Sequence, residues 1–317
     1  MPRGDGKSHS KLTVTSRLRL IGEGLRSSME RYPRDIRRSL SSRRHGSRVA
    51  TPQDFADRWK ATGDPDGPNA LTWLGHNTVL MKYAGMTILT DPVLSHRIGV
   101  RLPGLTIGPE RLLPMVLTPK DLPRADLVLI SHAHFDHLDR PTLKALIDRR
   151  TSIVTARNTR GLIPRGFGHI HELDWEKSLN INGLEITSIR PNHWGARTAW
   201  DRHRGFNSYI LGPATSRVLY AGDTAYTTNF DALGPLELGI FGIGAYDPWI
   251  HAHASPEQVW KMAIAAQVHR LLPVHHSTFK LSNEPMDEPL SRLLAAAGQG
   301  RSRVLDARVG EIVHLKS

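Results

Sequence analysis

The chain has 317 residues, a net charge of +12 and no cysteine, and 39% of its residues are hydrophobic. The absence of cysteine excludes disulfide bonds and thiolate metal sites, so any metal must be held by histidine and carboxylate side chains. No apolar run is long enough for a membrane-spanning helix, and no secretory signal follows the basic N-terminus. We therefore expect a cytoplasmic protein.

The positive charge is concentrated at the N-terminus. Residues 1–50 hold 13 Lys or Arg against 4 Asp or Glu, whereas the other 267 residues carry only +3. This distribution argues against nucleic acid as a partner of the main body. Within the basic extension, six apolar side chains follow helical spacing: Val14, Leu18, Ile21, Leu25, Met29 and Tyr32. The segment 12–44 could form a helix that lies on the inner surface of an anionic membrane or packs on the body or a partner. Alternatively, it could be a disordered tail.

A turn-rich segment at 62–68 separates this extension from the body. We expect a linker over 51–68 and one catalytic domain over 69–317. Strand-like runs at 70–74, 78–83 and 86–90 predict a meander, and the Pro- and Gly-rich stretch 92–123 predicts a long ordered loop. A buried strand at 126–131 and a helix at 141–150 follow.

The rest of the chain alternates between strand and helix patterns. Ser255, Pro256 and Gln258 form a capping-box pattern before the helix that extends to 268, and a last helix is expected near 289–297. Strands are expected in two groups, which predicts an α/β fold with two sheets sandwiched between helices. The expected strands are 152–155, 184–190, 206–211, 217–221, 239–243, 270–274 and 311–316.

The most informative motif is His132-Ala133-His134-Phe135-Asp136-His137, directly after the apolar run 127–130. Burying such polar groups without partners would cost about 1–3 kcal/mol each, so a core strand has no structural reason to end in four of them. Neutral imidazoles and a carboxylate suit a zinc-like divalent ion. The alternative is a solvated His-rich loop.

Four further apolar runs end in histidine or aspartate. They lead to His76, His193, Asp223 and the pair His275-His276. A lone histidine at a strand end is ordinary, but four such endings together with the six-residue motif predict polar groups along one edge of the sheets. This pattern indicates a metal-dependent active site.

The pattern resembles the metallo-β-lactamase superfamily, whose hallmark is H-x-H-x-D-H after a strand. The resemblance covers about residues 69–280 and implies a four-layer αβ/βα sandwich of two mixed β-sheets flanked by helices. Several stretches resemble the N-acyl-phosphatidylethanolamine phospholipase D-like branch. They are Trp73-Leu74-Gly75-His76-Asn77-Thr78, Leu89-Thr90-Asp91-Pro92, the segment 130–139, Tyr220-Ala221-Gly222-Asp223-Thr224 and His275-His276-Ser277-Thr278-Phe279.

Carried over residue by residue, the resemblance implies a two-metal site. One metal would be held by His132, His134 and His193, the other by Asp136, His137 and His275, and Asp223 would bridge both. Zinc is the default expectation, although iron or manganese would accept the same ligands. The motif match favours His275 over His276.

The resemblance also suggests roles around the metals. Asp136, Asp223 and His253 are expected to act in catalysis, with His253 contacting a phosphate or assisting the leaving group. His76 and Asp91 are expected to orient metal ligands. For His76 and His253 a purely structural role is an equal alternative.

The implied function is a metal-dependent hydrolase that uses a hydroxide held by two metals. We favour a phosphodiesterase acting on a small-molecule or lipid phosphodiester. The alternative is a lactonase or another carbonyl-ester hydrolase of the same fold, and a nuclease or a non-catalytic binding protein ranks lower. The oligomeric state has no readable signal in the sequence.

Overall fold

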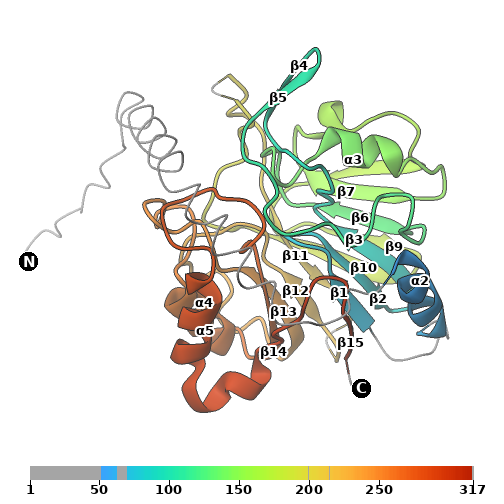
Figure 1. The fold of residues 1–317 in the computed structure, drawn as a ribbon. Coiled ribbons are helices and arrows are strands. Elements are labelled where there is room, and N and C mark those ends of the chain that lie inside the picture. Colours follow the sequence, from blue (N-terminus) through green and yellow to red (C-terminus); the bar gives the residue numbers. More distant parts are fainter. Residues whose placement is uncertain (1–50, 63–69, 199, 214, 316–317) are drawn as a thin grey trace, which may run out of the picture.

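A computed structural model describes residues 51–62, 70–198, 200–213 and 215–315. The predicted basic helix over 12–44 lies outside the described residues. Two β-sheets form the centre of the molecule (Figure 1). The first has the order β15-β1-β2-β3-β6-β7-β8, with β1 (Ala70–Trp73), β2 (Val79–Tyr83), β3 (Met86–Thr90), β6 (Leu127–Ile130), β7 (Ser152–Ala156), β8 (His169–Leu173) and β15 (Ile312–His314).

The second sheet has the order β14-β13-β12-β11-β10-β9. Its strands are β9 (Ser178–Ile181), β10 (Leu184–Ile189), β11 (Ser208–Leu211), β12 (Val218–Tyr220), β13 (Leu236–Gly242) and β14 (Val268–Val274). Both sheets mix parallel and antiparallel pairs: β3 pairs antiparallel with β2 and parallel with β6, and β12 pairs antiparallel with β11 and parallel with β13. A separate hairpin, β4 (Val100–Leu102) with β5 (Leu105–Ile107), forms a two-stranded sheet of its own.

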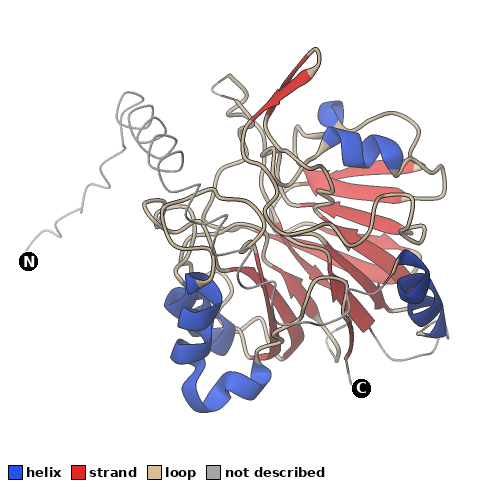
Figure 2. Ribbon diagram, viewed as in Figure 1, coloured by secondary structure: helices blue, strands red, loops and turns tan. Residues whose placement is uncertain are grey.

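Three apolar layers hold the sheets and helices together. Inward-facing side chains of both sheets, such as Met81, Ile186 and Tyr220, form the central layer. Helices α2 (Pro52–Ala61) and α3 (Arg140–Ala145) cover the outer face of the first sheet, and α4 (Pro256–Ala265) and α5 (Glu288–Ala297) cover that of the second (Figure 2). This arrangement confirms the predicted four-layer αβ/βα sandwich.

Most predicted elements are present near their expected positions. The meander is formed by β1, β2 and β3, and the capping box at Ser255 begins α4 with Gln258 as its partner. The helix expected at 141–150 is shorter, since α3 ends at Ala145. The strands β8 and β9 and the short 3₁₀ helices η1 (Arg160–Leu162) and η2 (Gly298–Arg303) had no clear sequence signal.

The prediction of a linker over 51–68 misses α2. Thr51 and Asp54 form a capping box, and Pro52 occupies the first helical turn. Phe55 and Trp59 are four residues apart, so both side chains lie on one helix face and are buried against the first sheet. Among the described residues, no helix is long and apolar enough to cross a membrane.

Strand direction places the predicted site residues at one edge of the sandwich. In the first sheet β1, β3 and β6 run the same way, because β2 is antiparallel to both β1 and β3, and β6 is parallel to β3. In the second sheet β10, β12 and β14 likewise share a direction. The loops after these six strands therefore leave from the same edge of each sheet.

Candidate metal centre

Histidine and carboxylate side chains converge where these loops meet. Two groups of four have ligand atoms within 4.8 Å of one another. One comprises His132, His134, His193 and Asp223, and the other comprises His76, Asp136, His137 and His275. All seven predicted metal ligands therefore meet in one cluster, and His76 joins them.

The first group brings imidazole nitrogens from two loops together. His132 Nε2 lies 2.8 Å from His134 Nδ1, and His193 Nε2 lies 3.4 Å from the same atom. His193 Nδ1 is 3.0 Å from the carbonyl oxygen of Ala252 and donates to it. The proton is thus held on Nδ1, which leaves the Nε2 lone pair facing the cluster.

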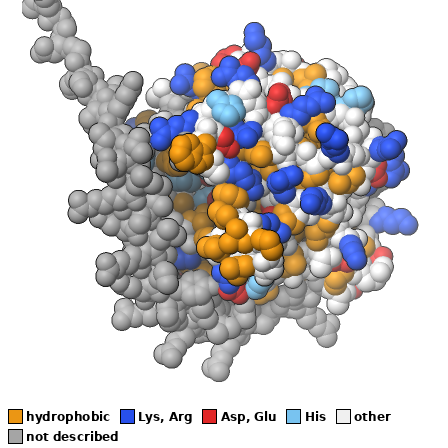
Figure 3. Space-filling model, turned by 90° about the horizontal axis from the view of Figure 1, so that it is seen from above, with side chains coloured by type: hydrophobic (Ala, Val, Ile, Leu, Met, Phe, Trp, Pro, Cys, Tyr) orange, Lys and Arg blue, Asp and Glu red, His pale blue; other side chains and the backbone are white. Residues whose placement is uncertain are grey.

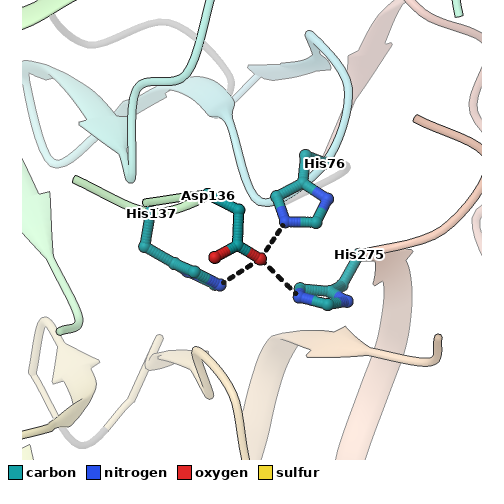
Figure 4. Close-up of side chains that lie close together, drawn as sticks. All are labelled: His76, Asp136, His137 and His275. Carbon is teal, nitrogen blue, oxygen red and sulfur yellow. Dashed lines mark hydrogen bonds and ion pairs between the residues drawn. The ribbon is translucent and has the colours of Figure 1, made fainter. Parts of the chain in front are cut away.

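The second group is centred on Asp136 Oδ2, as Figure 4 shows. This oxygen lies 2.9 Å from His76 Nε2, 3.4 Å from His275 Nε2 and 3.5 Å from His137 Nε2. His76 comes from the loop after β1 and His275 from the loop after β14, so the two sheets contribute opposite sides of this group.

Asp223 lies between the two groups. Its Oδ2 is 3.0 Å from His137 Nε2 and 3.2 Å from His275 Nε2, and it is 3.9 Å from the Nε2 atoms of both His132 and His193. One carboxylate oxygen therefore faces the ligand atoms of both groups, which is the position that a bridging ligand would occupy.

The residues fit a divalent cation. Asp223 Oδ2, His137 Nε2 and His275 Nε2 are buried without a hydrogen bond of good geometry among the described residues. Burying such atoms unsatisfied costs about 1–3 kcal/mol each, so their convergence calls for a shared partner. The donors are nitrogen and carboxylate oxygen only, a set that zinc, iron and manganese all accept.

Protonation differs within the cluster: three imidazoles are neutral near pH 7, whereas His137 and His275, which face Asp136 and Asp223, have raised pKa values and would release a proton when a cation binds. Burial lowers the pKa of His132 and His193 well below the usual value and that of His134 to about 4, so these imidazoles are neutral near pH 7. Burial alone would raise the pKa of Asp223, but His137 and His275 hold it well below its usual range. His275 itself is raised to a pKa of about 9 because Asp223 and Asp136 outweigh the effect of burial.

Asp91 lies beneath the cluster in the protein interior and holds His137 in place. Its fully buried carboxylate accepts hydrogen bonds from Ser131 N at 2.7 Å, from Tyr220 Oη at 2.6 Å and from His137 Nδ1 at 2.6 Å, and also from Ser131 Oγ. Since a carboxylate only accepts, His137 carries its proton on Nδ1 and directs Nε2 at the cluster. Through this contact Asp91 would orient His137 as a metal ligand, and that role stays a prediction.

Two further residues support the cluster without a role predicted from the sequence. Asn77 Nδ2 donates to Asp223 Oδ1 at 3.1 Å, and Tyr220 holds Asp91 from the second sheet. Asn77 directly follows His76, which is the one signal that could have identified it. Tyr220 lies inside a strand and reads as ordinary core.

The backbone at the site is strained. His76, Asp91 and His275 have φ values of 52°, 28° and 59°, in the left-handed region that costs about 1–3 kcal/mol for such residues. Gly222, beside Asp223, has a φ of 58°, and a Cβ there would lie 2.8 Å from Ser131 Cβ. These conformations persist because strands on both sides fix the loops.

The remaining candidates have distinct positions. His253 Nδ1 is 3.8 Å from Asp223 Oδ2, so His253 borders the cluster. His276 instead stacks on Trp73 with ring centroids 4.8 Å apart. Trp194 contacts the rings of His134 and His193 at the exposed side. Arg197 is held by the carbonyls of Ala133 and Leu138, so its guanidinium ties its loop to the six-residue motif.

Comparison with known proteins agrees with this geometry. The family model described as "Beta-lactamase superfamily domain" matches residues 86–276. An uncharacterised protein of Mycobacterium tuberculosis is 34% identical over 81% of this chain and 72% of its own length. The mitochondrial N-acyl-phosphatidylethanolamine-hydrolyzing phospholipase D of Saccharomyces cerevisiae is 29% identical over 72% of this chain and 52% of its own length.

Among solved structures, the metallo hydrolase Igni18 from Ignicoccus hospitalis aligns with a TM-score of 0.59 and 20% identity. The alignment covers 78% of this chain and 99% of that protein. At this level of identity the similarity concerns the fold, and it agrees with the four layers described above.

Proposed function

This chain belongs to the metallo-β-lactamase superfamily, in its N-acyl-phosphatidylethanolamine phospholipase D-like branch, and on that premise we propose that it hydrolyses phosphodiesters. The observation that carries the proposal is the position of Asp223 Oδ2, which faces the ligand atoms of both groups. Two cations held side by side suit a phosphodiester, because the phosphate places two oxygens at the reacting centre.

The proposed ligands follow the two groups. His132, His134 and His193 would hold one divalent ion, Asp136, His137 and His275 the other, and Asp223 both. Zinc is the first choice, with iron or manganese as alternatives. Bound there, the ions would lower the pKa of water toward neutrality and offset the charge that develops on the phosphate.

Side chains around the proposed metals would orient the ligands and bind the substrate. Asp136 accepts a hydrogen bond from His76, which fixes the orientation of the carboxylate. His253 lies at the margin of the cluster, with its ring 5.2 Å from those of His193 and His275. From there an imidazole N–H could donate a hydrogen bond to a phosphoryl oxygen or to the departing oxygen.

In the proposed reaction, water adds to phosphorus and the bond from phosphorus to one ester oxygen breaks. The departing oxygen takes up a proton, which yields an alcohol and a phosphomonoester. With an N-acyl-phosphatidylethanolamine, the products would be an N-acylethanolamine and phosphatidic acid. The similarity to the yeast phospholipase supports this substrate class.

The test is turnover of bis-p-nitrophenyl phosphate and of N-acyl-phosphatidylethanolamine by the full chain, with and without a chelator. We expect turnover that the chelator abolishes and that added metal restores. A panel of lactones serves as the comparison, because ring opening requires attack on carbon. If the chain opens lactones in a chelator-sensitive way but does not turn over phosphodiesters, our proposal is wrong and the carbonyl-hydrolase alternative holds.

A matched pair of variants separates the role of His253 from that of the metals. His253→Gln should lower turnover while the metal content stays at the wild-type level, since His253 is not among the proposed ligands. His276→Gln alters a buried histidine that directly follows His275 and stacks on Trp73. It should lower turnover much less than His253→Gln does. Equal losses in the two variants would indicate a structural role for His253.

A further inference from the structure

A large apolar surface lies outside the metal centre, on the β4–β5 hairpin. Among the described residues, ten large hydrophobic side chains are exposed, and four of them fall in this eight-residue segment. They are Val100, Leu102, Leu105 and Ile107, each 50 to 57% exposed. Single exposed hydrophobic residues are ordinary, but a cluster of this kind marks a contact surface.

Strand pairing places all four side chains on one face. Val100 is paired with Ile107, and Leu102 with Leu105, so each pair is directly opposed across the hairpin. Residues that alternate along a strand share a face, and therefore the two pairs lie side by side. Arg101 falls on the other face, where it reaches Ser95 and Asp139 at the start of α3.

The hairpin is braced at its base. Arg97 donates to the carbonyl of Gly108 at 2.7 Å and forms an ion pair with Glu110 at 2.6 Å. Ile98 N donates to the carbonyl of Pro109 at 3.0 Å. The polar face is therefore tied to the body, and the apolar face is presented outward.

The hairpin shares its end of the molecule with the metal centre. It follows β3, whose end leads to Asp91, and it projects from the top of the molecule in Figure 1. The loop 194–205, which follows His193, leaves from the same edge and carries Trp200, whose side chain is 93% exposed. Figure 3, which views this end, shows hydrophobic side chains gathered together with Lys and Arg side chains around them.

We propose that this end docks on a lipid bilayer through the apolar face of the β4–β5 hairpin. A second copy of the chain is a poorer occupant, since four half-exposed aliphatic side chains offer on the order of a few hundred Å², well below the roughly 800 Å² per partner of a stable interface. The exposed residues Trp200, Arg140 and Arg202 are of the aromatic and basic kinds that favour a lipid headgroup region.

The geometry limits how deeply the hairpin can enter. The outer edges of β4 and β5 have no neighbouring strand in their two-stranded sheet, and their polar backbone groups cannot enter the hydrocarbon core without a large cost. The side chains would therefore sit at the boundary between headgroups and acyl chains. This surface does not depend on the reaction proposed above, because docking requires only the hairpin and its surroundings.

The test is partition of the full chain onto vesicles of phosphatidylcholine with phosphatidylglycerol, measured by flotation. The combined variant Leu102→Thr and Leu105→Thr keeps β-forming residues and should bind about tenfold or more weakly. Ile264→Thr, at a 45% exposed position on α4, is the matched control and should bind as wild type. Turnover of the soluble substrate bis-p-nitrophenyl phosphate should be unchanged in both.

A second readout locates the contact directly. The chain has no cysteine, so Leu105→Cys and Ile264→Cys each provide one site for an environment-sensitive fluorophore. On vesicles, emission should shift to the blue at position 105 and stay constant at 264. Equal emission changes at both positions, or wild-type vesicle binding by the double variant, would overturn the proposal. The proposal would also be overturned if the wild-type chain were a dimer, the double variant were a monomer, and neither bound vesicles.

Discussion

Replacement of Asp91 by asparagine is the sharpest test of how the protein prepares a metal ligand. Asp91 is fully buried and accepts hydrogen bonds from Ser131, Tyr220 and His137. An asparagine has one acceptor oxygen and one amide group. If that oxygen keeps its bond to Ser131 N, the amide faces His137 Nδ1, and two donors then meet.

Two outcomes are open to His137 in Asp91→Asn, and both weaken the site. If Nδ1 keeps its proton, one or two buried donors lose their acceptor, which costs about 1–3 kcal/mol each. If the proton moves to Nε2, the lone pair that faces the cluster is lost. We therefore expect a loss of about 2–4 kcal/mol in the free energy of unfolding and about 10–100-fold weaker metal binding.

The assay combines urea unfolding of the metal-free protein with chelator competition for metal affinity. Tyr220→Phe is the control, because it removes one donor to Asp91 and leaves the contact between Asp91 and His137 intact. It should cost about 1 kcal/mol and change metal affinity only slightly. If Asp91→Asn binds metal as tightly as wild type, or if both variants lose affinity equally, the orienting role of Asp91 is refuted.

Three further predictions concern the same cluster. Asp223→Asn removes the carboxylate charge that faces both groups, so it should lower the metal content and reduce turnover by about a hundredfold or more. Full turnover in this variant would contradict a bridging role for Asp223. Gly222→Ala forces a Cβ toward Ser131 at a φ of 58° and should cost about 1–3 kcal/mol in urea unfolding, whereas an unchanged midpoint would show that the turn relaxes. Arg197→Lys loses the paired contacts to Ala133 and Leu138 and should lower the melting temperature by a few degrees, a shift that differential scanning calorimetry would detect.

The sequence predicted the layers because the buried strands and the covering helices each have a distinct sequence signal. Buried strands such as β6 are continuous apolar runs, and α4 begins with a capping box. The helix α2 was missed because only Phe55 and Trp59 mark its buried face within a polar segment. The edge strands β8 and β9 are partly exposed, and the polar residues they contain hide the strand pattern.

The sequence predicted that the candidate ligands lie along one edge of the sheets, because each follows the end of a strand. Their division between two metals came from the resemblance to the superfamily. Their supporting residues were harder to identify. Tyr220 acts through a hydroxyl group inside a strand, and its partner Asp91 is 129 residues away in the sequence. The apolar face of the β4–β5 hairpin was also hidden, since the stretch 92–123 has no clear periodicity outside those six strand residues.

The central claim is that two metals share one site built on Asp223, and metal counting tests it most directly. After reconstitution with zinc and removal of free metal, elemental analysis of the full chain should give close to two ions per chain. His193→Ala should retain about one ion, because Asp136, His137 and His275 remain available to hold it. A wild-type content of one ion or fewer, or an unchanged content in His193→Ala, would contradict the two-metal centre.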